Sequence, residues 1–67
     1  MKLEITIPKK DFKDETLNEV ILYLKRYNIV SIGKKSNLKE DKIYIDTDMV
    51  DLIEKIPRLF RCKVLVI

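Results

Sequence analysis

The segment from Asp41 to Ile67 constrains the fold more than any other part of the chain. A strand is indicated around Ile43 and Ile45, which alternate with polar side chains as residues on the buried side of a sheet do. The pattern then changes to one apolar residue every three or four positions over 48–56, which predicts a helix. Alternation returns over about 60–67, so the segment as a whole predicts a β–α–β unit.

The expected helix has a clear apolar stripe and clear end signals. The stripe, at spacing i, i+3, i+4, i+7, consists of Met49, Leu52, Ile53 and Ile56. Either Thr47 or Asp48 can cap the helix start, and Pro57 is expected to end the helix near Ile56 because proline lacks the N–H that the next turn needs. The inward side chains expected on the final strand are Phe60, Cys62, Val64 and Val66.

The first half of the chain repeats the same order of elements. A strand is expected over 2–7, a helix over 15–27 that Asp11 or Asp14 could cap, and a strand over 29–35. Asn28 is expected to end the helix. The side chains expected to point inward from these elements are Leu3, Ile5, Ile7, Leu17, Val20, Ile21, Leu24, Val30 and Ile32.

The resulting order, β–α–β–β–α–β, is that of the ferredoxin-like split β–α–β fold. Right-handed crossovers would place both helices on one face of a four-stranded antiparallel sheet of strand order 4-1-3-2. The other sheet face would remain open to solvent or to a partner. The chain of 67 residues is expected to form a single α+β domain over 1–67, with a small core.

The residue types exclude several kinds of chemistry. Cys62 is the only cysteine and histidine is absent, so disulfides, the usual zinc sites and Cys–His nucleophiles are excluded. The acidic run beginning at Asp46 fails as a calcium loop, because Val50 stands where an oxygen ligand is needed and Asp51 where a glycine is needed. Gly33 stands alone, so a glycine-rich phosphate loop is excluded as well. We therefore expect a non-catalytic protein without metal or cofactor.

Two families with this fold carry motifs that the chain lacks. Heavy-metal-binding domains have a Cys-x-x-Cys after the first strand, where this chain has Pro8-Lys9-Lys10-Asp11. RNA-recognition motifs carry aromatic residues on both central strands, and only Tyr44 corresponds. A signal peptide and a long apolar run are also missing, so a soluble cytoplasmic protein without membrane contact is expected. The bias toward ten Ile and eleven Lys indicates either an AT-rich genome or a thermophilic source.

The expected open sheet face collects the excess positive charge. The basic residues assigned to it outnumber Glu4 and Asp46 by three, which equals the net charge of the whole chain, +3. We expect Lys2, Lys35 and Lys42 in one row across neighbouring strands, with Tyr44 offering a ring on which a base could stack. The predicted nucleic-acid-binding residues are Lys2, Lys35, Lys42, Tyr44, Arg61 and Lys63.

This charge distribution has two interpretations. Lysines on an open sheet can simply keep it soluble and unpaired. Alternatively, they bind nucleic acid, and RNA is favoured over duplex DNA because neither expected helix presents a basic face that could read a groove.

The final strand points to a different partner. Its outward positions end in Leu65 and Ile67, which are apolar where the other strands carry charge. As an edge strand it would also present unpaired backbone groups, which template strand addition. The alternative function is therefore a protein–protein interaction or regulatory module that dimerises or docks through this edge, with Ile29 adding to the contact.

Overall fold

The computed structural model describes residues 1–9 and 15–67. It contains β1 (Lys2–Pro8), α1 (Glu15–Lys25), β2 (Gly33–Ser36), β3 (Glu40–Asp46), α2 (Leu52–Leu59) and β4 (Lys63–Val66). The expected caps Asp11 and Asp14 lie outside the described residues.

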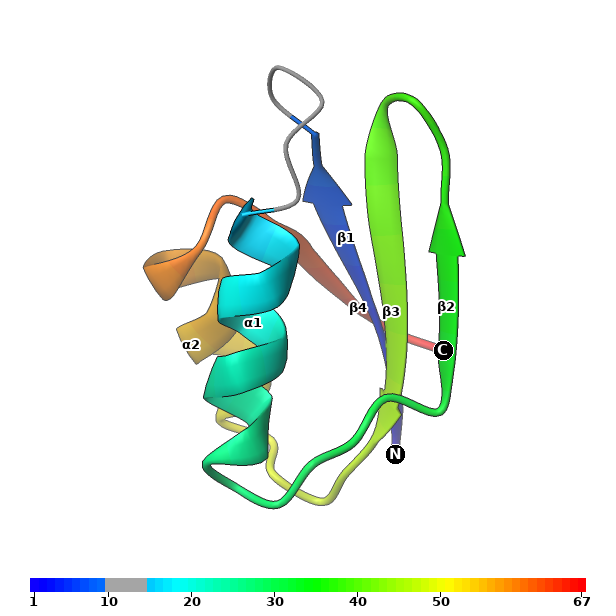
Figure 1. The fold of residues 1–67 in the computed structure, drawn as a ribbon. Coiled ribbons are helices and arrows are strands. Elements are labelled where there is room, and N and C mark those ends of the chain that lie inside the picture. Colours follow the sequence, from blue (N-terminus) through cyan, green and yellow to red (C-terminus); the bar gives the residue numbers. More distant parts are fainter. Residues whose placement is uncertain (10–14) are drawn as a thin grey trace.

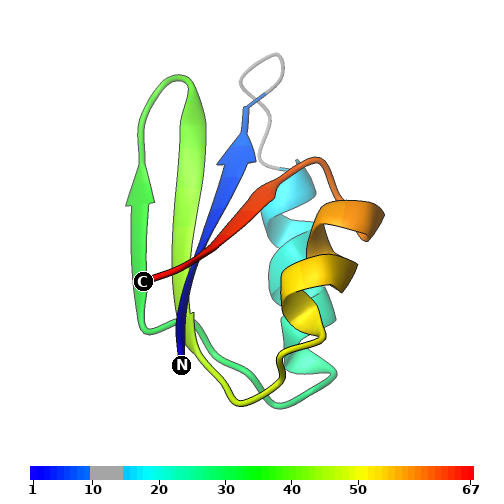
Figure 2. The same cartoon turned by 180° about the vertical axis from the view of Figure 1, so that it is seen from behind.

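The strands form one antiparallel sheet, and both helices lie on the same side of it (Figures 1 and 2). Neighbouring strands follow the order β2-β3-β1-β4. This order is written from the β2 edge, whereas the expected 4-1-3-2 is written from the β4 edge. The strands β1 and β3 are central and the strands β2 and β4 are edges, so each edge has one unpaired side.

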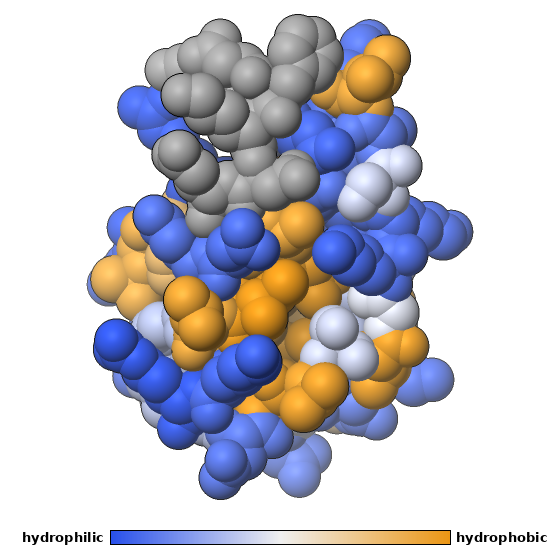
Figure 3. All heavy atoms as spheres, viewed as in Figure 1, coloured by the Kyte–Doolittle hydropathy of each residue, from blue (hydrophilic) through white to orange (hydrophobic). Residues whose placement is uncertain are grey.

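The core lies between the sheet and the helices. The strands β1 and β3 alternate as the sequence predicts, and their inward aliphatic side chains are at most 1% exposed. The helices bury one stripe each against them. The buried apolar side chains are Leu3, Ile5, Ile7, Leu17, Val20, Leu24, Ile29, Ile43, Ile45, Leu52 and Ile56. Figure 3 shows apolar side chains in the middle of the molecule, between α1 and the sheet.

The segment before β2 corrects the sequence prediction. Val30 and Ile32, expected inward, are 73% and 60% exposed, and the strand begins only at Gly33. The cause is the way α1 ends. Asn28 takes a left-handed conformation with φ of 58°, and the Ile29 N–H donates back to the Leu24 carbonyl at 3.1 Å.

These features form a Schellman motif, which joins the residue after the left-handed position to the last turn of the helix. The Asn28 N–H completes it by donating to the Lys25 carbonyl at 3.0 Å. The motif turns Ile29 inward against Leu24, so Ile29 is 8% exposed. Asn28 therefore ends the helix region as predicted, but Ile29 belongs to the core and is not available as the interface residue that the sequence indicates.

The helix α2 begins and ends later than predicted. Thr47 Oγ1 accepts the Met49 N–H at 3.1 Å, which makes a turn before the helix and leaves Asp51 as the cap residue without a side-chain hydrogen bond. Pro57 lies inside the helix, so the prediction that it ends the helix is wrong. It is tolerated in the last turn because the proline leaves only one carbonyl, that of Ile53, without its helical donor.

The strand β4 is also shorter than expected. Val64 and Cys62 are half-buried, but Val66, expected inward, is 52% exposed. Both views show β4 running away from α2 toward its end, so the end of the strand leaves the helical cover (Figures 1 and 2). Exposed apolar surface therefore collects at this end.

Within 1–9 and 16–67, one charged residue lies in the core. Asp41 is 1% exposed on the inward side of β3. Its carboxylate accepts a hydrogen bond from Ser36 Oγ at 2.6 Å and lies 3.5 Å from Lys9 Nζ. The alternation of β3 places Asp41 on the same side as Ile43, but the sequence analysis did not recognise it as a buried group.

Candidate functional site

The open sheet face presents the polar side chains that alternate with the core. Cross-strand pairing places Lys35 beside Lys42, Lys42 beside Thr6, and Thr6 beside Lys63. The row of lysines is therefore Lys35, Lys42 and Lys63, with Thr6 between the last two. The prediction that Lys2 completes this row is wrong, because the register pairs Lys2 with Asp46.

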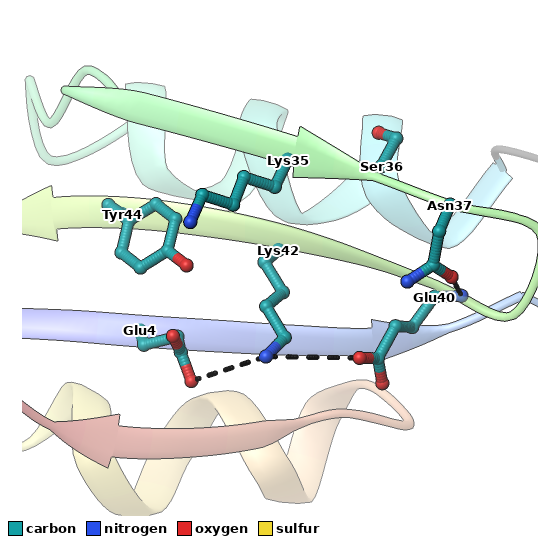
Figure 4. Close-up of a pocket in the computed structure, with 7 residues that line it drawn as sticks. All are labelled: Glu4, Lys35, Ser36, Asn37, Glu40, Lys42 and Tyr44. Atoms are coloured by element: carbon teal, nitrogen blue, oxygen red, sulfur yellow. Dashed lines mark hydrogen bonds and ion pairs between the residues drawn. The ribbon is translucent and has the colours of Figure 1, made fainter.

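Lys42 is the most constrained member of the row. Its Nζ lies 3.9 Å from Glu4 Oε1 and 3.8 Å from Glu40 Oε1 (Figure 4). The segment that predicts this strand begins at Asp41, so the open face expected from the sequence does not include Glu40. These two carboxylates offset the charge of Lys42, so the positive excess on the face is smaller than the sequence indicates.

Tyr44 lies in the next row of the same face. It is half-exposed on β3, with Glu4 as its neighbour on β1 and Gly33 on β2. The glycine keeps the side of the ring open, since a Cβ at position 33 would lie 3.4 Å from Tyr44 Cδ2. Lys35 Nζ lies 6.0 Å from the ring centroid, at the outer limit of a cation–π contact. Hydrogen bonding with the Glu4 carboxylate, together with desolvation, raises the pKa of the Tyr44 hydroxyl.

These side chains surround a shallow polar depression of about 570 Å³. Figure 4 shows Lys35, Tyr44 and Lys42 lying over it from β2 and β3, with Glu4 reaching in from β1. The β2–β3 hairpin forms one end of the depression. Asn37 holds that hairpin, because its Oδ1 accepts the N–H groups of Lys39 at 2.7 Å and Glu40 at 2.8 Å.

The other predicted binding residues lie around the depression. Lys63 is exposed on β4 and Arg61 is exposed just before it, while Lys2 is exposed at the start of β1. The structure thus brings Lys35, Lys42 and Tyr44 together and leaves the remaining three at the β4 side and the far end of the face. Sequence reasoning missed Glu40 and Asn37; the two-residue spacing from Glu40 to Lys42 is the signal that could have placed Glu40 on this face.

The β4 edge lies on the opposite side of β1 from this depression. Leu65 and Ile67, predicted as interface residues, are each 58% exposed. Cys62 is half-buried, and its Sγ lies 3.7 Å from the Ile56 carbonyl oxygen. Burial raises the pKa of the Cys62 thiol to about 11.

Within 1–9 and 15–67, His, Cys, Asp and Glu side chains form no group of three that could hold a metal ion. Among the helices of the described part of the chain, none is long and apolar enough to cross a membrane.

Comparison with known proteins returned no relative. The chain matches no protein-family model, and it has no significant match among curated proteins or solved structures.

Proposed function

We propose that this chain is a small ferredoxin-like module that binds single-stranded RNA on its open sheet face and carries out no catalysis. The observation that supports the proposal is the position of Tyr44. Its half-exposed ring lies on a central strand of an uncovered sheet, beside Gly33 and 6.0 Å from the Lys35 ammonium group. A base stacked on such a ring contributes about 1–3 kcal/mol.

The lysine row would contact the backbone of the bound strand. With strands about 4.8 Å apart, the row from Lys35 on β2 to Lys63 on β4 spans about 14 Å. That length suits a few nucleotides lying across the sheet strands, with Lys35 and Lys63 near phosphates at either end. Lys42 contributes less, because Glu4 and Glu40 already pair with it.

Single strands fit this surface better than a duplex does. A sheet face with one exposed ring can hold an unstacked base, whereas reading a duplex requires an element that enters a groove. The two carboxylates beside Lys42 repel phosphates, so we expect weak binding that depends on only about two or three phosphate contacts. Such binding would show a slope of log K against log salt of roughly −2.

The test is a salt titration of binding to short RNA of mixed sequence, followed by fluorescence anisotropy. We expect Lys35→Glu to weaken binding at least about tenfold, and Tyr44→Leu to weaken it by about 10- to 100-fold, the equivalent of one lost stacking contact. Lys55→Glu is the matched control, because Lys55 is exposed on α2, on the other side of the sheet. The same oligonucleotide as duplex should bind more weakly.

Two results would contradict the proposal. One is the absence of RNA binding at low salt. The other is an equal loss of affinity in Lys35→Glu and Lys55→Glu, which would show that only the net charge matters. Circular dichroism of each variant ensures that any loss is not a loss of folding.

A further inference from the structure

Among the strands that the structure describes, β4 pairs with β1 alone, so defined residues of β4 have backbone groups without a partner strand. The Ile67 N–H donates to the Lys2 carbonyl at 3.0 Å. Leu65 and Lys63 lie two and four residues earlier and pair with β1, so their backbone N–H and C=O groups point toward β1 as well. Backbone groups in an antiparallel strand point to alternate sides. The N–H and C=O groups of Val64 and Val66 therefore point away from the sheet, at its free edge.

The side chains at this edge are unusually apolar for an uncovered strand. Leu65, Val66 and Ile67 are 58%, 52% and 58% exposed. Beside them, a depression of about 530 Å³ is lined in part by Pro57, Cys62 and Val64. Edge strands in proteins that remain monomeric are usually protected by charge, proline or a bulge, and over 64–67 the sequence supplies none of these side chains.

We propose that β4 pairs with β4 of a second copy of this chain, antiparallel and with the two-fold axis at Leu65. In this register Val64 of each copy faces Val66 of the other. The outward N–H and C=O groups of both valines are then satisfied in both copies. Leu65 packs against Leu65 of the second copy on the open-face side.

Two observations select this register. If the two-fold axis lay at Val64, Val66 would face Cys62 of the second copy, and the Cys62 N–H would have to donate across the interface. That N–H donates instead to the Phe60 carbonyl at 3.0 Å. With the axis at Leu65, Lys63 faces Ile67 of the second copy, so the two Lys63 side chains stay about four residues apart along the strands and do not repel at close range.

A second copy at β4 also fits better than pairing at the other edge. The edge strand β2 reads Gly33-Lys34-Lys35-Ser36, so self-pairing there would bring lysines side by side. The strand β4 carries one charged residue, Lys63, at its start. Charge therefore blocks the β2 edge and leaves the β4 edge self-complementary, as a two-fold interface must be.

The contact is short, so the dimer should be weak. Stable interfaces bury about 800 Å² on each partner, which is more than a four-residue strand and the three exposed aliphatic side chains of 65–67 provide. We expect a dissociation constant on the order of 0.1–1 mM. The product would be one continuous sheet that carries both open faces on the same side.

Sedimentation equilibrium of the full chain over a range of concentrations tests the proposal. Val66→Pro is the sharpest variant, since it removes an outward N–H and leaves the pairing with β1 intact. We expect Val66→Pro and Leu65→Lys to weaken association at least about tenfold while remaining folded. Leu22→Lys is the matched control, because Leu22 is 62% exposed on α1.

Amide exchange provides a second readout. The Val64 and Val66 N–H groups should gain protection as the concentration rises, whereas the N–H of Leu65 should be protected at all concentrations. A strictly monomeric chain at about 1 mM would overturn the proposal. So would a dimer that Val66→Pro leaves unchanged. Neither result bears on whether the open face of a single copy binds a short RNA, which is measured separately.

Discussion

At the scale of single residues, environment decides what Cys62 can do. A thiol can be reactive only as the thiolate, and partial burial between α2 and β4 disfavours that form. With its pKa raised to about 11, the thiol remains protonated at neutral pH. A half-buried, protonated thiol packs as a small apolar side chain, as the expected inward position of Cys62 on the final strand implies.

The raised pKa of Cys62 predicts that its thiol reacts slowly with alkylating reagents. The ordinary pKa of the group is 9.0, so at pH 8 the folded chain should hold about 100-fold less thiolate than an exposed thiol. Alkylation by iodoacetamide should be slower by about that factor, and its rate should keep rising with pH up to about 11. The urea-unfolded chain is the control, and equal rates in the folded and unfolded states would contradict the prediction.

At the scale of elements, the alternating and three-to-four-residue patterns predicted β1, β3 and the buried stripe of α1. Those patterns work because each element buries one side against the core. They failed where a turn sets the direction of the chain. The Schellman motif at Asn28 makes Ile29 inward and Ile32 outward, although Val30 and Ile32 show the same alternation as a strand.

The limits of α2 show a second kind of failure. The sequence predicts that the helix ends at Pro57, whereas the helix continues to Leu59. The free-energy cost of a proline in a helix depends on which carbonyl loses its N–H donor. The position of that carbonyl within the helix depends in turn on where the helix begins. The start is set by the turn at Thr47, which a list of capping residues alone does not locate. Leu52 and Ile56, both fully buried, hold the helix in place around Pro57.

Replacing Pro57 with alanine should stabilise the protein. Alanine restores an N–H that can donate to the Ile53 carbonyl, and this gain exceeds the loss of the rigidity that proline gives the unfolded chain. We expect the free energy of unfolding to rise by about 1 kcal/mol, measured by urea denaturation. Lys55→Ala, at an exposed position of the same helix, should change it by less than about 0.5 kcal/mol. A loss of stability in Pro57→Ala would contradict the prediction.

At the scale of the whole molecule, the two proposals concern two different uncovered parts of the described sheet: the open face with the lysine row, and the β4 edge. The sequence predicted Lys35, Lys42 and Tyr44 on the open face and Leu65 and Ile67 at the edge, but it did not predict Glu40 or the exposure of Val66. It could not predict which lysines are neighbours, because register depends on how β1 and β3 align in space. That alignment replaces Lys2 by Thr6 in the row and pairs Lys42 with two carboxylates.

The two surfaces together make a prediction about RNA length. A dimer through β4 would present two open faces to one strand, so a long RNA should gain affinity by binding both. We expect Val66→Pro to weaken binding of an RNA of about 16 nucleotides several-fold while leaving one of about 4 nucleotides unchanged. Anisotropy at protein concentrations near the dimer dissociation constant measures both. Equal effects on the two lengths would show that the β4 edge and the open face do not act together.

The buried carboxylate of Asp41 has a consequence for how the chain reaches a single structure. Aliphatic alternation repeats every two residues, so sliding β3 by two positions would still turn isoleucines inward, and hydrophobicity alone ranks such alignments as nearly equal. Sliding β3 along β1 would also carry Asp41 away from Lys9, which follows β1, and would leave the buried carboxylate without this ion pair, at a cost of several kcal/mol. A single buried carboxyl group thus distinguishes alignments that the apolar residues alone leave close in energy, and it separates the native state from its nearest misaligned competitors.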